Sequence, residues 1–108
     1  MERHVICHLD ELPELTSRRF DVGDVEIVVA RSGTRVFALE DRCSHDDGRF
    51  DDARVRASAT SFEIECPRHG GRFDLADGRA TRMPAVAPIE AFAAGVEDDL
   101  VWVELPEL

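Results

Sequence analysis

The segment that decides the fold is Cys43–Gly70, CSHDDGRFDDARVRASATSFEIECPRHG, which holds two of the three cysteines and two of the four histidines. These four residues form two short motifs: Cys43-Ser44-His45 is C-x-H, and Cys66-Pro67-Arg68-His69 is C-x-x-H. Each motif brings a thiol and an imidazole to one turn, so the two turns together offer four ligands of the kinds that bind zinc or iron. The spacing therefore predicts a metal centre held between two loops.

Two kinds of metal centre suit this ligand set. A Cys2His2 set is common in structural zinc sites, but such sites usually pair cysteine with cysteine in the first motif. A one-residue spacer between thiolate and imidazole also crowds a tetrahedron around one ion. A binuclear iron centre relaxes this crowding, because Cys43 and Cys66 can hold one iron while His45 and His69 hold the other. Each pair of ligands would then cross between the two loops.

The third cysteine, Cys7, is expected to be a small core residue. If the chain around it is a strand, alternation places Val5, Cys7 and Leu9 on the core side. His4 and His8 then lie on the exposed side, where two histidines without a nearby third ligand make a poor metal site. Because cytosolic thiols are usually reduced, ligation explains the other two cysteines better than a disulfide does.

The remaining sequence predicts short strands separated by turns, and no segment has a sustained helical period. Residues 24–30 (DVEIVVA) and 35–40 (RVFALE) flank a glycine turn and predict a hairpin, with Val25, Ile27 and Val29 on one side of the first strand. Residues 89–93 and 100–105 predict a final hairpin, with Trp102 on the face opposite the core. Several short strands at close spacing favour an all-β antiparallel sandwich or barrel.

Length and charge limit the classes of function. A chain of 108 residues allows a single domain, 1–108, with one modest core. The formal net charge of -10 argues against nucleic acid and anionic membranes as partners, and suits a protein with a basic patch. No apolar run approaches the length of a spanning helix, and the first residues lack the pattern of a secretory signal. We therefore expect a cytoplasmic chain.

At the two motifs the sequence resembles the Rieske family, whose [2Fe-2S] cluster is bound through C-x-H and C-x-x-H in this order. Residues 36–45 (VFALEDRCSH) and 66–73 (CPRHGGRF) are similar to the family's two cluster loops with their strands. Residues 74–85 (DLADGRATRMPA) are similar to the segment that follows, with a glycine turn and a proline loop over the cluster. The resemblance implies a Rieske-type sandwich or barrel with a small cluster-binding subdomain of two loops, at about 41–85. It implies one [2Fe-2S] cluster held by Cys43, His45, Cys66 and His69.

One departure from small ferredoxins of this family is the 20-residue interval between the two motifs, which predicts an enlarged hairpin around residues 49–61. A second concerns high-potential Rieske proteins, which carry a disulfide between the loops and a serine and tyrosine that donate hydrogen bonds to sulfur. The corresponding places in this chain hold Gly48 and Arg68, and Gly71 and Phe73. With both hydroxyls absent and Asp46 and Asp47 beside the site, partly opposed by Arg68, we expect a low reduction potential, toward about -150 mV.

The resemblance implies the ferredoxin component of a bacterial ring-hydroxylating or related non-haem oxygenase system. Such a chain passes single electrons from a flavoprotein reductase to a terminal oxygenase, and is not itself the enzyme. Oxygenation needs a mononuclear iron site of the 2-His-1-carboxylate type in a further domain. In this role His45 and His69 would be the port through which the electron leaves.

Three alternatives stay open. One is a Rieske protein of iron-sulfur cluster assembly or of another redox pathway. Another is the small subunit of an assimilatory nitrite reductase, which the usual loss of the cluster ligands in that class disfavours. The third, outside redox chemistry, is an interaction module stabilised by zinc.

Overall fold

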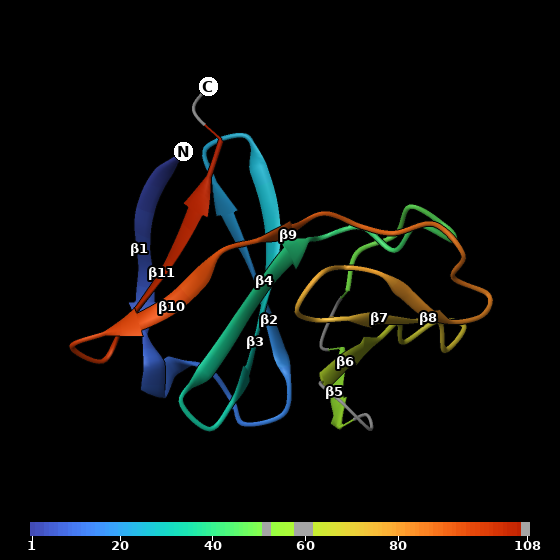
Figure 1. The fold of residues 1–108 in the computed structure, drawn as a ribbon, viewed down its shortest axis with the longest axis horizontal. Coiled ribbons are helices and arrows are strands. Elements are labelled where there is room, and N and C mark those ends of the chain that lie inside the picture. Colours follow the sequence, from blue (N-terminus) through green and yellow to red (C-terminus); the bar gives the residue numbers. More distant parts are fainter. Residues whose placement is uncertain (51–52, 58–61, 107–108) are drawn as a thin grey trace.

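The computed structural model describes residues 1–50, 53–57 and 62–106. These residues form eleven strands and one short 3-10 helix, and none of them lies in an α-helix (Figure 1). The elements are β1 Glu2–His8, η1 Leu9–Glu11, β2 Ser17–Val22, β3 Val25–Ser32, β4 Arg35–Glu40, β5 Arg54–Ala57, β6 Phe62–Glu65, β7 Arg72–Asp74, β8 Ala80–Arg82, β9 Ala91–Phe92, β10 Ala94–Glu97 and β11 Leu100–Leu105. The predicted all-β class is confirmed.

The strands form three antiparallel sheets, in the orders β1-β11-β10, β2-β3-β4-β9 and β5-β6-β7-β8. Figure 1 shows the third sheet to one side of the other two. Two clusters of buried side chains fill the interior. The first, which we call the base core, joins the first two sheets through residues such as Ile27, Val101 and Val103. The second, the loop core, joins β3 and β4 to the third sheet through residues such as Val28 and Phe73.

Strand β3 is buried on both faces, which the sequence pattern did not predict. Ile27 and Val29 lie in the base core, whereas Val28 and Ala30 lie in the loop core. An apolar run without alternation is the pattern of a strand covered on both sides. The predicted hairpin of β3 and β4 is confirmed, and its turn includes Gly33 with a φ of 62°.

The final hairpin differs from the predicted one. β11 pairs with β10, and the turn between them holds Asp98 and Asp99 at φ values of 52° and 62°. Two consecutive residues at positive φ are typical of the tight hairpin turns that match strand twist. β9, within the predicted partner segment, pairs instead with β4. Trp102 lies on the face opposite the core, as predicted, with the Arg3 guanidinium carbon 3.8 Å from the centroid of its ring.

The first strand also corrects a prediction. The register of β1 against β11 shifts between Val5 and Cys7, so Ile6 and Cys7 both pack against the base core. Val5, predicted to face the core, is 63% exposed. Such a bulge places two residues of one strand opposite one residue of its partner and reverses the alternation beyond it.

In the predicted enlarged hairpin, β5 pairs in register with β6. The part of that segment at 51–52 and 58–61 lies outside the described residues. Among the described residues, no helix is long and apolar enough to span a membrane.

Candidate metal centre

The two cysteine loops have the same backbone hydrogen bonds. The Cys43 N–H donates to the Gly48 carbonyl at 2.7 Å, and the Cys66 N–H donates to the Gly71 carbonyl at 2.7 Å. Each cysteine carbonyl also accepts from the N–H four residues further on, at 2.7 Å in the first loop and 3.0 Å in the second. The loops are therefore two copies of one turn, although their spacers differ by one residue.

The third sheet and the loop core hold these turns in place. Cys66 follows the end of β6 and is buried on the same side as Ile64. Below the loops the Phe50 and Phe73 rings meet edge to face with their centroids 5.6 Å apart, and neither ring is exposed. Edge-to-face contacts of this kind favour one fixed arrangement of the two rings. The two cysteines therefore belong to the same buried cluster as this pair of aromatic rings.

A buried carboxylate closes the first loop. Asp41, at the beginning of this loop, accepts a hydrogen bond from the Phe50 N–H at 2.8 Å. Its other oxygen accepts from the Arg19 guanidinium of β2, and the Asp41 side chain is fully buried. Because a buried carboxylate is stable only when it is paired, Asp41 fixes both ends of the loop to β2.

All four predicted site residues come together at the outer end of the loops. Cys43 and Cys66 are buried at 1% exposure, and their sulfur atoms and a carboxylate oxygen of Asp46 lie within 4.8 Å of one another. His45 and His69 are exposed, and their ring centroids are 5.1 Å apart at an interplanar angle of 85°. The two thiols therefore lie together in the interior, and the two imidazoles lie together at the surface.

This donor set fits a [2Fe-2S] cluster. The cysteines meet each other across the two loops and so do the histidines, which is the pairing that two irons require and one tetrahedral ion does not. Burial is the main cause that raises the pKa of the Cys43 thiol, so metal binding must stabilise its thiolate. Gly70, at a φ of 77°, has open space where a Cβ would point, which leaves the end of the second loop uncrowded.

The acidic residues beside the cysteines are paired with arginines. Arg68 holds the pKa of Asp46 well below its usual range, chiefly through a side-chain hydrogen bond. Arg42 donates to Asp47 at 2.7 Å. On the sequence alone, both carboxylates count as negative charges that disfavour reduction of the cluster. Since each lies against a guanidinium, their combined effect on the potential is smaller than the sequence alone suggested.

The predicted proline loop contacts both cysteine loops. The Ser44 hydroxyl donates to the Ala87 carbonyl at 2.5 Å, and a Cβ on Gly71 would lie 3.0 Å from the Ala85 Cβ. Met83 and Val86 of the same loop are 74% and 75% exposed. Sequence reasoning did not single out Ser44, Ala85 or Ala87, because the motifs do not show which residues of the proline loop, 14 to 43 positions further along the chain, contact each cysteine loop.

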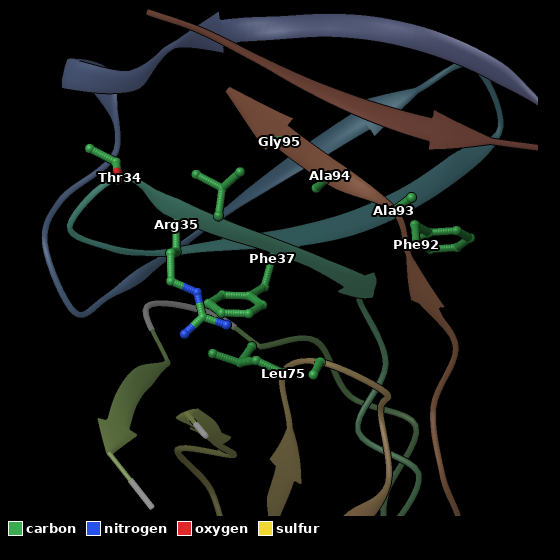
Figure 2. A pocket seen from close by; sticks show the side chains of 10 residues that line it. Thr34, Arg35, Phe37, Leu75, Phe92, Ala93, Ala94 and Gly95 are labelled. Carbon is green, nitrogen blue, oxygen red and sulfur yellow. The ribbon is translucent and has the colours of Figure 1, made fainter. Parts of the chain in front are cut away.

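A separate pocket of about 400 Å³ lies at the start of β4, between that strand, residues 92–95 and residues 75–76 (Figure 2). Arg35 and Phe37 point toward Leu75 in this view. Of the side chains that line it, only Thr34 and Arg35 are polar. The pocket contains none of the predicted ligands and no pair of groups suited to acid-base chemistry.

Comparison with known proteins agrees with this geometry. The family model of the Rieske [2Fe-2S] domain matches residues 2–93. The ferredoxin subunit of 3-phenylpropionate/cinnamic acid dioxygenase from Shigella flexneri is 32% identical over 107 residues, which cover 99% of this chain and 97% of the relative. Both comparisons span the two motifs.

Solved structures show the same similarity. The ferredoxin of carbazole 1,9a-dioxygenase from Nocardioides aromaticivorans superposes with a TM-score of 0.85 at 34% identity, covering 95% of this chain and 97% of that one. A structure titled as the complex of reduced oxygenase and oxidized ferredoxin in carbazole 1,9a-dioxygenase matches with a TM-score of 0.79 at 28% identity, covering 94% and 91%.

A nitrite reductase small subunit from Mycobacterium tuberculosis superposes with a TM-score of 0.87 over 99% of this chain and 97% of its own. At 15% sequence identity, this similarity shows a shared fold and not a shared function. By the family model and by relatives that match along nearly their whole length, the chain belongs to the Rieske [2Fe-2S] domain family.

Proposed function

We propose that this chain is a Rieske-type ferredoxin that carries single electrons from a flavoprotein reductase to a terminal non-haem iron oxygenase. The observation that carries the proposal is the arrangement of the four site residues, with two buried thiols behind two exposed imidazoles. The ferredoxin subunits of dioxygenases to which the chain is similar support the same role.

In this proposal Cys43 and Cys66 hold the inner iron, and His45 and His69 hold the outer one. When bound, the cluster accepts and releases one electron. The protein's own contribution is to bury the thiolates, to exclude water from them and to expose the imidazole edges to a partner. Because the histidines are exposed while the cysteines are not, a partner's cofactor can approach closest on the histidine side.

The partner surface follows from the same geometry. Met83 and Val86 are exposed apolar side chains in the loop that contacts both cysteine loops. Apolar contacts with a polar rim are typical of the centre of a protein interface. We propose that the reductase and the oxygenase dock here in turn, because one port limits the carrier to one partner at a time. The carbazole complex of oxygenase and ferredoxin supports the second of these partners.

We propose that residues 1–108 form one domain, with the cluster loops within 41–85. We also propose that the chain is cytoplasmic, since thiols there remain reduced and available for ligation. All three cysteines are free in the structure.

The first test is low-temperature EPR of the purified protein after reduction with dithionite. We expect a rhombic signal whose average g value lies below that of the free electron, with two irons per chain. Cys43→Ser and His69→Ser should abolish it. Cys7→Ser and His4→Ser are matched controls outside the site and should retain it. A colourless protein that contains zinc would contradict the proposal and favour the zinc-stabilised module.

The second test concerns direction of transfer. A flavoprotein reductase and a terminal non-haem iron oxygenase are mixed with NADH, and oxygenase reduction is followed with and without this chain. Transfer that depends on the chain is the expected result. A chain that shows the rhombic signal but supports no such transfer would point instead to cluster assembly or to another redox pathway.

A further inference from the structure

Arg68 of the second cysteine loop reaches across to the first. Its Nε donates to Asp46 Oδ2 at 2.7 Å, and its Nη2 donates to Asp46 Oδ1 at 3.1 Å. Its Nη1 donates to the backbone carbonyl of Arg49 at 2.5 Å. One guanidinium therefore makes three hydrogen bonds to the other loop, to positions on both sides of Gly48. Such a planar fork fixes direction as well as distance.

Gly48 is the residue that allows this contact. A Cβ at this position would lie 2.6 Å from Cζ and Nη2 of Arg68 and 2.9 Å from its Nε. The Gly48 N–H donates to Asp46 Oδ1 at 2.9 Å, so the carboxylate is held from two sides. Gly48 is not among the residues with positive φ. The glycine therefore makes room for the guanidinium and is not required by the backbone conformation.

The environment of the pair makes its geometry effective. The Arg68 and Asp46 side chains are 33% and 23% exposed, so solvent competes with their hydrogen bonds only in part. An exposed ion pair contributes little to stability, and most of the effect expected here comes from the bidentate geometry. The hydrogen bond between the two side chains is also the main cause that raises the pKa of Arg68.

The Asp46 carboxylate could also bind a metal ion held between the two cysteine sulfurs, and Arg68 competes with that metal for the carboxylate. One of its carboxylate oxygens lies within 4.8 Å of the sulfur atoms of both Cys43 and Cys66. Two thiolates and a carboxylate form a ligand set that zinc accepts. Both oxygens of Asp46 accept hydrogen bonds from Arg68 in this same arrangement, so the guanidinium occupies the oxygens with which the carboxylate would bind a metal between the sulfurs.

We propose that Arg68 is a positioning residue of the metal centre, which ties the second loop to the first and occupies the Asp46 carboxylate, so that Asp46 does not become a third ligand beside the two thiolates. The effect has two parts. The tie slows loss of the bound cluster, and the engaged carboxylate lowers the share of sites that take zinc. This inference rests on the ligand set proposed above, and not on the identity of the redox partners.

The test uses the cluster-loaded protein and four variants. Arg68→Lys keeps the charge but loses the fork, and Arg68→Gln loses both. Asp46→Asn removes the carboxylate, and the double variant Arg68→Gln/Asp46→Asn removes the pair. Arg79→Gln is the matched control, since that guanidinium is 66% exposed and pairs only with Asp74 and Asp77 among the described carboxylates.

Cluster loss is followed by visible circular dichroism in a fixed concentration of urea, and zinc and iron are measured in each purified protein. Both Arg68 variants should lose the cluster about tenfold faster, a change that corresponds to about 1.4 kcal/mol in the barrier. The zinc-to-iron ratio should rise in Arg68→Gln and return toward the original in the double variant, whose cluster loss stays fast. The Arg79 variant should match the unmodified chain in both measurements.

An Arg68→Lys variant that loses its cluster at the original rate would overturn the tie, because charge alone would then suffice. An unchanged zinc-to-iron ratio in Arg68→Gln would overturn the role assigned to Asp46. If Arg68→Gln does not accumulate, the lysine variant still decides the first point, and Asp46→Asn, which should also shorten cluster lifetime, decides it independently. If the unmodified chain shows no rhombic EPR signal after reduction, the ligand set itself would be refuted.

Discussion

Gly71 is expected to influence both the stability of the second loop and the reduction potential. The residue is buried, and a Cβ on it would lie 3.0 Å from the Ala85 Cβ and 3.2 Å from the Ala85 backbone nitrogen. Gly71 is not among the glycines with positive φ, so an added side chain meets crowding and no backbone strain. Two substitutions, Gly71→Ala and Gly71→Ser, add the same Cβ, and only the second adds a hydroxyl.

The stability cost should be the same for both variants. Overpacking of a buried position costs about 1–3 kcal/mol. Replacing glycine also reduces the freedom of the unfolded chain, which returns about 0.4–1 kcal/mol. We therefore expect each variant to lose about 0.5–2 kcal/mol of unfolding free energy, measured by urea titration of the cluster-loaded protein.

The potential should separate the two variants. A serine hydroxyl at this place can donate to a cluster sulfur, and hydrogen bonds to charged acceptors contribute about 1.5–3 kcal/mol against about 0.5–1.5 kcal/mol for neutral ones. Reduction makes the cluster more negative, so the bond gains about 1 kcal/mol. Because 59 mV corresponds to about 1.4 kcal/mol for one electron, the serine variant should lie about 40 mV above the alanine variant.

Protein-film voltammetry gives both midpoint potentials under one set of conditions. Equal potentials in the two variants would refute the reasoning that the missing hydroxyl lowers the potential of this chain. Unchanged stability in both would refute the close packing of Ala85 on the second loop. The alanine variant is the control for any shift caused by displacement of the proline loop alone.

Three further predictions concern the scaffold, and each is checked by the urea midpoint together with cluster content. Phe73→Ala removes a fully buried ring that meets Phe50 edge to face, and should cost about 3–5 kcal/mol; a loss below 1 kcal/mol would contradict the tight packing of this ring beneath the cysteine loops. Gly78→Ala places a Cβ 1.9 Å from the Ile89 carbonyl oxygen at a φ of 78°, and should cost more than the roughly 1–2 kcal/mol typical of left-handed strain alone; unchanged stability would contradict this contact. Replacing Asp98-Asp99 by Asn-Gly suits the positive φ of both residues and should add about 0.5–1 kcal/mol; a destabilised protein would show that the two carboxylates have another role.

The sequence predicted the four site residues because their spacing places a thiol and an imidazole in each of two turns. The structure brings Cys43, His45, Cys66 and His69 together in that way, and their role as ligands stays a prediction that EPR must test. The cysteine positions depend mainly on local turns and on strand alternation before Cys66, which are properties that a sequence carries directly.

The contacts between loops could not be predicted in the same way. Asp46 and Arg68 are 22 residues apart, and only the folded backbone shows that a guanidinium lies over a glycine between them. The register of β1 failed for a related reason, since a bulge at Ile6 inserts a residue that no alternation pattern reveals. The burial of β3 on both faces requires a second core, and one strand pattern does not say how many cores a chain has.

Net charge alone proves a poor guide to the docking surface. Residues 41–88 hold nine acidic residues and eight arginines, whereas the rest of the chain holds 14 acidic residues and five arginines. The charge of -10 therefore lies almost wholly on residues 1–40 and 89–108, which we call the base. On the third sheet, Arg56, Arg72 and Arg82 lie within 3.3, 2.9 and 3.7 Å of one carboxylate oxygen of Glu65.

A strongly basic partner would be attracted to the base, although the exposed histidines belong to the nearly neutral part of the chain. Long-range attraction falls away within about a Debye length, roughly 8–10 Å at ordinary salt. Contacts at the tip, such as those of Met83 and Val86, must then select the productive orientation. Electron transfer should consequently depend less on salt than a charge of -10 suggests, and a steep fall in rate with added salt would place the docking surface on the acidic base.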